Sequence, residues 1–206
     1  MGNNYPSARL GNETSLEERR KQVLEAAVHS LTVNGYETVR LRDIARRAGV
    51  STGLIQHYFE SRDELLEEAF NYACRQFFEQ WTEPSDPATP SWNLLVDLLD
   101  ETADPFHALT WIEFTTASAR HESLRDALRS VYDRWEVVLD GLIVRGAESG
   151  EFSPLLSVND IIDILMVALD GGLVALASET ALTTPEDMRD RWRMLARTLL
   201  RPAVGS

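Results

Sequence analysis

The stretch GYETVRLRDIARRAGVSTGLIQHYFESRDELL, residues 35–66, decides the fold. Apolar residues recur in it at helical spacing, which predicts one short helix at about residues 41–48 and another at about 52–59. Gly49 and Val50 lie between these helices and make a tight turn. Two short helices joined in this way predict a helix-turn-helix.

The second of these helices has the features that DNA recognition requires. Ser51 can cap its N-terminus, and Thr52 and Gly53 place small groups at the end that can face a major groove. The free amides and the dipole at this end also attract phosphate. The residues expected in the core of this region, rather than on DNA, are Ile44, Ala45, Val50, Ile55 and Phe59.

Further helices are predicted on both sides of this stretch. Ser15 and Glu18 form a capping box that opens a helix, and residues 1–14 are expected to be a flexible arm. A second capping box at residues 61–64 starts a long helix, and the proline-rich residues 82–90 connect it to the rest. The remaining helices are expected at about 91–101, 105–120, 124–150, 158–179 and from 184 onward. Asp104, followed by Pro105, is expected to cap the second of these helices, and Thr184 the last. The sequence therefore predicts an all-α protein.

The charged residues are distributed unevenly along the chain. Net charge at pH 7 is −13, yet residues 1–60 hold eight Arg or Lys against seven Asp or Glu. The remainder holds 12 basic against 26 acidic residues. Basic residues are thus concentrated where the helix-turn-helix lies, and the acidic remainder would repel phosphate.

The sequence predicts neither a secretion signal nor a membrane segment. The N-terminus has no apolar run, and the most apolar stretch, residues 161–177, contains Asp163 and Asp170. It is also shorter than the roughly 20 apolar residues that span a bilayer. Cys74 is the only cysteine, which excludes an internal disulfide and suits a reducing compartment. We therefore expect a cytoplasmic protein.

The fixed spacing of residues in the first third of the chain resembles the N-terminal signature of the TetR family. The matching positions are Ile44-Ala45, Ala48-Gly49-Val50-Ser51, Gly53, Ile55, His57-Tyr58-Phe59, Arg62 and Glu64-Leu65-Leu66. The match runs without a gap over about residues 16–70. It implies a homodimeric transcriptional repressor that binds a palindromic operator in double-stranded DNA and is released by a small molecule.

The DNA contacts expected from position and resemblance are Arg40, Arg42, Ser51, Thr52, Gly53, Leu54, Gln56, His57, Tyr58 and Arg62. Arg40 departs from the family pattern, because it stands where a threonine or serine usually caps the helix; it can contact phosphate instead. Gln56 replaces a frequent aromatic residue, and its amide either reads adenine or contacts phosphate. Leu54 either contacts a thymine methyl group or packs in the core.

The C-terminal region holds the candidates for an effector site. The segments WIEFTTASARHESLR and ALDGGL, together with STGLIQHYF, are similar to the BetI-like branch of the family, whose best-known members respond to choline. The candidate lining residues are Trp81, His107, Trp111, Glu113, Phe114, Trp135 and Asp170. Aromatic rings and carboxylates suit an organic cation, and the core-facing stripes hold no arginine cluster for an anion. The effector is therefore predicted to be cationic, or neutral and hydrophobic.

Each of these candidates also has a purely structural alternative. The tryptophans can be core residues, and Asp170 can form a structural salt bridge, since a charge inside an apolar helix must be paired or hydrated. The histidines share no metal-like spacing with Cys74, so no metal site is expected. No cofactor and no catalytic cluster are expected either.

These observations divide the chain into a flexible arm at 1–14, a helix-turn-helix domain at 15–60 and a ligand-binding and dimerisation domain at 61–206. The resemblance implies that the last two helices of each subunit form a four-helix bundle. The residues expected between subunits are Leu173, Leu176, Trp192 and Leu195. The alternative function is a helical ligand-binding protein, or an enzyme, that does not bind DNA.

Overall fold

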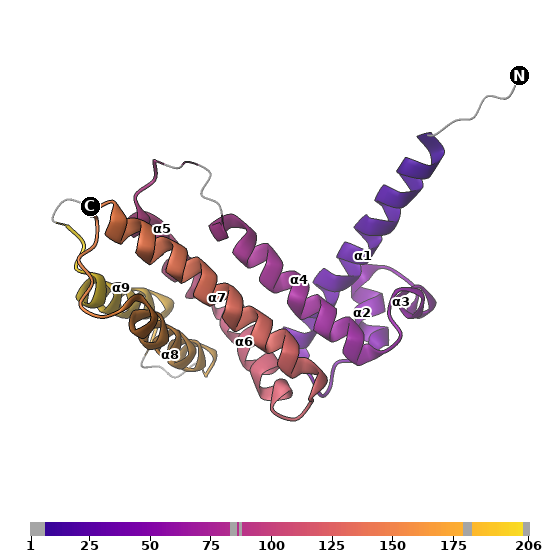
Figure 1. Ribbon diagram of the computed structural model, residues 1–206. Helices are drawn as coiled ribbons and strands as arrows, with labels where there is room; N and C mark the ends of the chain where they lie inside the picture. Colours follow the sequence, from indigo (N-terminus) through magenta and orange to yellow (C-terminus); the bar gives the residue numbers. More distant parts are fainter. Residues whose placement is uncertain (1–6, 83–85, 87, 179–182, 204–206) are drawn as a thin grey trace, which may run out of the picture. The chain divides into compact units, whose positions relative to one another are not determined.

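A computed structural model describes residues 7–82, 86, 88–178 and 183–203 of the chain, and its regular structure in these ranges is helical apart from one isolated β-bridge (Figure 1). The helices are α1 (Ser7–Asn34), α2 (Leu41–Ala48), α3 (Thr52–Tyr58), α4 (Arg62–Thr82), α5 (Ser91–Thr102), α6 (Pro105–Ser118), α7 (Ser123–Glu148), α8 (Val158–Ala177) and α9 (Pro185–Leu200). This confirms the all-α prediction. None of the helices within these ranges is both long enough and apolar enough to cross a membrane.

The first helix is longer than the capping box at Ser15 predicts. α1 begins at Ser7, so a helix replaces the predicted flexible arm over residues 7–14. These residues contain no proline and one glycine, Gly11. A single glycine costs a helix only about 1 kcal/mol relative to alanine, which does not end it. The first six residues of the predicted arm lie outside the described part of the chain.

Two later helices begin at the caps that the sequence predicts. The carboxylate of Asp104 accepts from the backbone N–H groups of Phe106 and His107, at 2.9 and 3.0 Å, and Pro105 occupies the first turn of α6. Thr184 and Asp187 form a capping box at the start of α9. The N–H of Thr184 holds the pKa of Asp187 below its ordinary value, because it donates to the ionised carboxylate.

The chain forms two compact units, Met1–Ala73 and Cys74–Ser206, so the first part of α4 belongs to the first unit. This unit therefore extends beyond the predicted boundary at residue 60. It does so because α4 is held to α1, where Arg20 pairs with Glu68 and the hydroxyl of Tyr72 donates to Glu25 at 3.1 Å. The large side chains buried completely in the first unit are Tyr36, Ile44, Ile55, Leu65 and Leu66.

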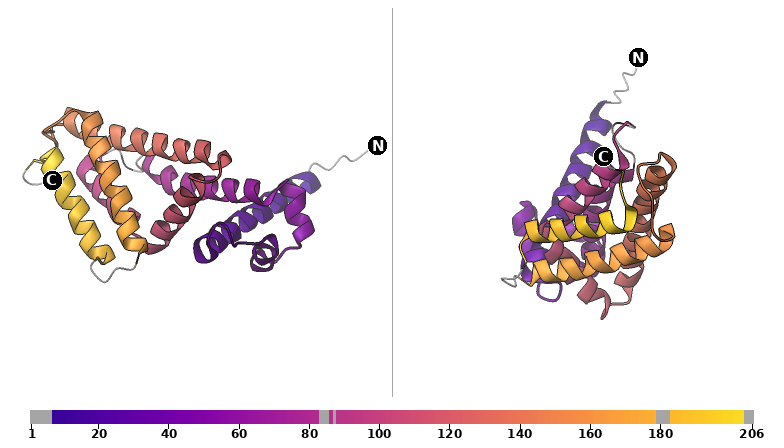
Figure 2. Two further views of the ribbon diagram at one scale, coloured as in Figure 1. Left: turned by 90° about the horizontal axis from the view of Figure 1, so that it is seen from below. Right: turned by 90° about the vertical axis from the view of Figure 1, so that its left-hand side faces the viewer.

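In the second unit, α8 packs against α6, α7 and α9, and α8 and α9 lie side by side (Figure 2). Gly172 allows α9 to approach closely, because a Cβ atom at this position would lie 2.4 Å from the ring of Trp192. The indole N–H of Trp192 donates to the carbonyl oxygen of Ala168 at 3.1 Å. Trp192 is thus a packing residue between two helices of one protomer.

This packing corrects the prediction of which residues face a second subunit. Leu173, Leu176 and Trp192 are buried within the protomer. The apolar side chains that α8 and α9 expose are Ile164, Val167, Val174 and Met194. The prediction was wrong for these three residues, because helical spacing does not tell which face of α8 or α9 the same chain covers. Leu195 is half-buried, and its place between subunits stays a prediction.

The segment after α7 is bound to the end of the described chain. The N–H of Ser153 donates to the carbonyl of Leu200 at 2.9 Å, and that of Leu155 donates to Leu199 at 3.0 Å. In return, the N–H of Ala203 donates to the carbonyl of Glu151 at 2.8 Å. These bonds join the connector between α7 and α8 to the residues that follow α9.

Candidate functional site

α3 presents a polar face to solvent. Thr52 and Gln56 lie one helical turn apart and are exposed, as are Gly53 and His57 beside them. Ser51 caps the helix, and its hydroxyl accepts from the backbone N–H of Leu54 at 3.1 Å. Five of the predicted DNA contacts therefore share one exposed surface at the start of a capped helix.

The turn before α3 is built around Gly49. This glycine has a φ of 67°, a left-handed conformation that strains residues with a Cβ atom. The N–H of the next residue, Val50, donates to the carbonyl of Ala45 at 3.0 Å and closes the end of α2. The predicted glycine turn is confirmed, and it fixes the angle between α2 and α3.

Four arginines at or on α2 are exposed: Arg40, Arg42, Arg46 and Arg47. Arg40 is the residue before the helix and makes no capping bond through its side chain, as its chemistry predicts. Arg46 forms an ion pair with Asp43 at 2.5 Å. Arg46 and Arg47 are further candidates for phosphate contacts that were not predicted. Their position in the sequence, directly before Ala48 and Gly49 of the turn, could have indicated them.

Arg62 and Tyr58 are engaged within the first unit. The guanidinium of Arg62 donates through Nε to the carbonyl of Val39 at 2.9 Å and through a terminal nitrogen to the carbonyl of Tyr36. It also pairs with Asp63 at 2.5 Å and lies over the Tyr36 ring. Tyr58 is half-buried, with its hydroxyl 3.5 Å from the carbonyl oxygen of Leu16. Leu54 is half-buried as well, which leaves both of its predicted roles open.

In the second unit, Asp170 is the centre of a polar cluster. Its two carboxylate oxygens accept from the indole N–H of Trp111 at 3.1 Å and from the hydroxyl of Tyr132 at 2.8 Å. Burial raises the pKa of Asp170, although both hydrogen bonds oppose the rise. The structure thus gives this carboxylate two neutral donors in place of the alternative salt bridge.

A second group of candidates is joined by ring contacts. Trp135 lies against Phe78 and Phe77, with ring centroids 5.2 and 5.7 Å apart, and Phe77 lies 5.3 Å from the ring of His107. Phe114 is completely buried. These contacts bring aromatic side chains of α4, α6 and α7 together.

Trp81 and Glu113 are the remaining residues of the predicted lining. Trp81 lines an open pocket of about 500 Å³ with the charged residues Asp97, Asp100, Glu101, Glu186, Arg189, Asp190 and Arg193. Arg193 pairs there with Asp100. Glu113 is half-buried on α6. Trp81 therefore lines a charged pocket, and its role in an effector site stays a prediction.

Three aromatic residues of the site were missed by sequence reasoning: Phe77, Phe78 and Tyr132. Phe77 and Phe78 precede Trp81 on the same helix, and Tyr132 is three residues before Trp135, so helical spacing offered a signal. The bond between Tyr132 and Asp170 joins helices 38 residues apart in sequence, and no local pattern predicts it.

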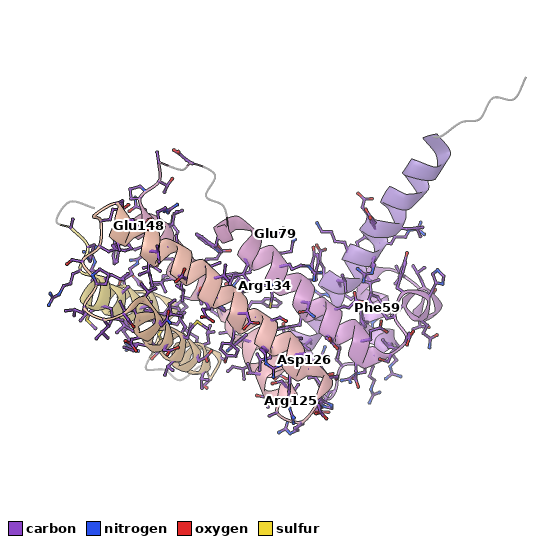
Figure 3. The ribbon with its side chains drawn as sticks, in the orientation of Figure 1. Phe59, Glu79, Arg125, Asp126, Arg134 and Glu148 are labelled. Carbon is purple, nitrogen blue, oxygen red and sulfur yellow. The ribbon has the colours of Figure 1, made fainter. Side chains whose placement is uncertain are left out.

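The arginines of α7 differ in their exposure. Figure 3 labels Arg125 and Asp126 at the start of α7, where Arg125 is exposed, and Arg134 farther along. Arg134 lines an open groove of about 370 Å³ with Glu79 of α4. Arg134 and Arg145 are half-buried, and the Nε of Arg145 donates to the hydroxyl of Ser91 at 2.9 Å.

Metal-ligating residues do not cluster in the described ranges, where no group of three or more His, Cys, Asp or Glu could hold an ion. Burial raises the pKa of the Cys74 thiol to about 12, so the thiolate that binds metals is disfavoured.

Comparison with known proteins adds the family. The model of bacterial regulatory proteins of the tetR family matches residues 23–69, which include α2, α3 and the Gly49 turn. The chain is 26% identical over 187 residues to the HTH-type transcriptional regulator BetI of Paraburkholderia phytofirmans, covering 74% of this chain and 95% of that protein. These comparisons support a TetR-family transcriptional regulator that is BetI-like.

Solved structures show the same fold for this chain. A transcriptional regulator from Saccharomonospora viridis, in complex with choline, is 23% identical with a TM-score of 0.78, over 89% of this chain and 98% of that one. FadR from Bacillus subtilis, in complex with stearoyl-CoA, is 22% identical with a TM-score of 0.69, over 85% and 96%. The family model and the curated relative confirm the prediction of a DNA-binding transcriptional regulator, and their names indicate a regulator rather than an enzyme.

Proposed function

We propose that this regulator acts in the cytoplasm as a homodimer that represses transcription by binding a palindromic operator until a small molecule releases it. The observation that carries the proposal is the exposed polar face of α3 beyond the Gly49 turn. The side chains of Thr52 and Gln56 have no hydrogen-bond partner in the described part of the chain, so they are available to base edges. The amide of Gln56 can pair with adenine in the major groove.

The phosphate contacts are assigned to groups around this face. Arg42 and Arg40 supply positive charge from α2, and the N-terminus of α3 supplies backbone N–H groups near Ser51 and Gly53. His57 lies beside Gln56 on the exposed side of α3. Phosphate contacts of this kind set affinity, whereas Gln56 and Thr52 set sequence preference.

A homodimer is supported by the exposed apolar side chains of α8 and α9. Ile164, Val167 and Val174 follow each other on one side of α8, with Gly171 between the last two, and Met194 lies on α9. Val167 is 74% exposed within the protomer. A second copy of this surface would cover it and place two copies of α3 on half-sites about 34–36 Å apart.

The effector is assigned to the Asp170 cluster. No lysine or arginine in the described ranges pairs with this half-buried carboxylate, and Trp111 and Tyr132 lie edge to face beside it, with centroids 5.5 Å apart. A bound organic cation would supply the missing charge and contact the ring faces. The choline bound by the S. viridis regulator has this chemistry. A neutral hydrophobic compound is the alternative.

Release from DNA is assigned to α4, which spans Arg62–Thr82 and contributes residues to both units. Phe77 and Phe78, whose rings contact Trp135, lie on the same continuous helix as Arg62. An effector that binds the two states of α4 with different affinity would change the separation of the recognition helices in the dimer. The operator would then bind less tightly.

A binding assay with Gln56→Ala tests the DNA function. An operator duplex is first selected by the wild-type protein from a random-sequence library, and affinity is then measured by electrophoretic mobility shift. Gln56→Ala is expected to weaken binding about tenfold or more, the usual contribution of a bidentate base contact. The matched control is Gln76→Ala, an exposed glutamine on α4, which should bind as the wild type does. If selection enriches no sequence, the alternative of a helical protein without operator binding holds.

Thermal shift with three compounds tests the effector assignment. Choline should raise the melting temperature of the wild type but not of Asp170→Asn, whereas stearoyl-CoA, an anion, should leave both unchanged. A neutral alcohol of the size of choline tests the alternative. Stabilisation by stearoyl-CoA alone would overturn the cationic assignment.

A further inference from the structure

Arg62 is the first residue of α4, and all three nitrogens of its guanidinium have partners within its own unit. Its Nε donates to the carbonyl of Val39 at 2.9 Å, and a terminal nitrogen donates to the carbonyl of Tyr36. The other terminal nitrogen pairs with Asp63 at 2.5 Å. The plane of the guanidinium lies over the ring of Tyr36, with its carbon 4.9 Å from the centroid.

The two carbonyls belong to the connector between α1 and α2, residues 35–40. Tyr36 and Val39, which supply the carbonyls, are both buried, so the connector is held by its side chains as well as by Arg62. The next residue, Arg40, is the N-cap of α2. The position of this connector therefore sets where α2 begins.

The same chain of contacts continues to the recognition helix. α2 ends at Ala48, and Gly49 is its C-cap. The bond from the N–H of Val50 to the carbonyl of Ala45 then fixes the turn into α3. A shift of the connector against the start of α4 would thus move α2, the turn and α3 together. Arg62 is the side chain that joins the first residue of α4 to this series.

The chemistry of the contact requires an arginine. A guanidinium offers five N–H donors in one plane, so it can bind two carbonyls and a carboxylate while it stacks on a ring. A lysine ammonium keeps the charge but cannot reproduce the planar fork or the stacking. A phosphate contact depends mainly on charge, and a lysine would largely preserve it.

We infer that Arg62 is a positioning residue for operator recognition: it clamps the α1–α2 connector to the start of α4 and so sets the position of α3, rather than binding DNA phosphate. The inference rests on the proposed operator binding. It replaces the expectation that Arg62 contacts phosphate. It also predicts that the clamp affects binding to the operator and leaves binding to unrelated DNA unchanged.

The test measures affinity by fluorescence anisotropy over a series of KCl concentrations. The probes are the operator duplex selected by the wild type and a scrambled duplex of the same length. Arg62→Lys should bind the operator about ten- to a hundredfold less tightly, the equivalent of losing a hydrogen bond to a charged group. Its affinity for the scrambled duplex and the slope of log affinity against log salt should match the wild type. Arg62→Gln, a second variant without the charge, should also keep the wild-type slope.

Two arginines of the same unit provide matched controls. Arg20 lies over the ring of Phe59 and pairs with Glu68 of α4, yet does not touch the connector. Arg20→Lys should therefore lower the melting temperature and leave the ratio of operator to scrambled affinity unchanged. Arg42→Ala should weaken binding to both probes and flatten the salt slope by about one unit, as loss of a phosphate contact does.

Two results would overturn the inference. In the first, Arg62→Lys binds both probes as the wild type does. In the second, Arg62→Gln weakens both probes equally and lowers the slope as Arg42→Ala does, which is the behaviour of a phosphate contact. If the wild type itself does not distinguish the probes, the proposed operator binding fails instead.

Discussion

The polar residues of α3 and those around Asp170 are arranged in opposite ways. Thr52 and Gln56 lie on the surface, above a core of apolar side chains, and their side chains bind nothing in the described part of the chain. Asp170 is half-buried, and both of its oxygens accept from side chains of other helices. One set of polar groups is open to an outside partner, whereas the other is satisfied internally.

This difference fits the partner that we propose for each region. A base edge competes with water, so an exposed amide loses little when DNA is absent. A half-buried carboxylate has less contact with water, so internal donors stabilise it until its proposed ligand replaces them. The α3 residues should therefore contribute to binding alone, and the Asp170 cluster should contribute to stability as well.

The largest effect is expected at a third kind of surface, the exposed apolar side chains of α8. Val167→Glu should give monomers and weaken operator binding about 100-fold or more, because a single recognition helix cannot reach two half-sites. Light scattering and the mobility shift measure the two effects. The control is Val137→Glu on α7, a valine that is 63% exposed, which should remain dimeric. If the Val167→Glu protein stays dimeric, the exposed apolar face of α8 is not part of the dimer interface.

The comparison between α3 and Asp170 is tested directly by a pair of truncations. Trp111→Phe removes one donor to Asp170 and should lower the free energy of unfolding by about 1 kcal/mol, because water replaces part of the lost bond at this half-buried carboxylate. Gln56→Ala should change it by less than about 0.5 kcal/mol, as is usual for an exposed residue. Denaturant unfolding by circular dichroism measures both. Equal effects would contradict the distinction drawn between the two regions.

A smaller effect is expected from pH. Burial raises the pKa of Asp170 above its ordinary value of 3.8, so between these two values the folded protein binds more protons than the unfolded chain. Protonated Asp170 therefore stabilises the folded state. This stabilisation is fully present below pH 3.8 and is lost as pH rises through the raised pKa of Asp170. The stability difference between wild type and Asp170→Asn should therefore shift in favour of the variant over this window. An unchanged difference from pH 4 to pH 7 would show that Asp170 titrates normally.

Sequence alone predicted the first unit well because its signals are local. Gly49, Ser51 and the spacing of Ile44, Ile55 and Phe59 each constrain residues within a few positions, and the structure confirms the turn, the cap and the burial. The capping pattern at Ser15 failed, since a potential cap does not stop a helix that can continue upstream. Arg62 was assigned to phosphate because its charge is visible in sequence and its carbonyl partners are not.

The second unit was predicted only as a set of helices. The helix starts at Asp104 and Thr184 were predicted correctly. Contacts between distant helices decide the rest: which side chains bind Asp170, which pocket Trp81 lines and that Leu173 is buried within the protomer. Hydrophobic spacing gives the direction of a stripe on one helix. It does not identify the helix that covers the stripe.

The backbone bonds between residues 151–155 and the end of α9 have a consequence for local unfolding. Because Ser153 and Leu155 donate to Leu200 and Leu199, and Ala203 donates back to Glu151, neither segment can open without releasing the other. Their amide hydrogens should then exchange with solvent deuterium as one group, at a common rate. Proteolysis that removes Ala203 would break its bond to Glu151. Amide exchange should then become faster in residues 151–155, roughly fifty positions earlier in the sequence, so exchange there reports whether the residues after α9 are intact.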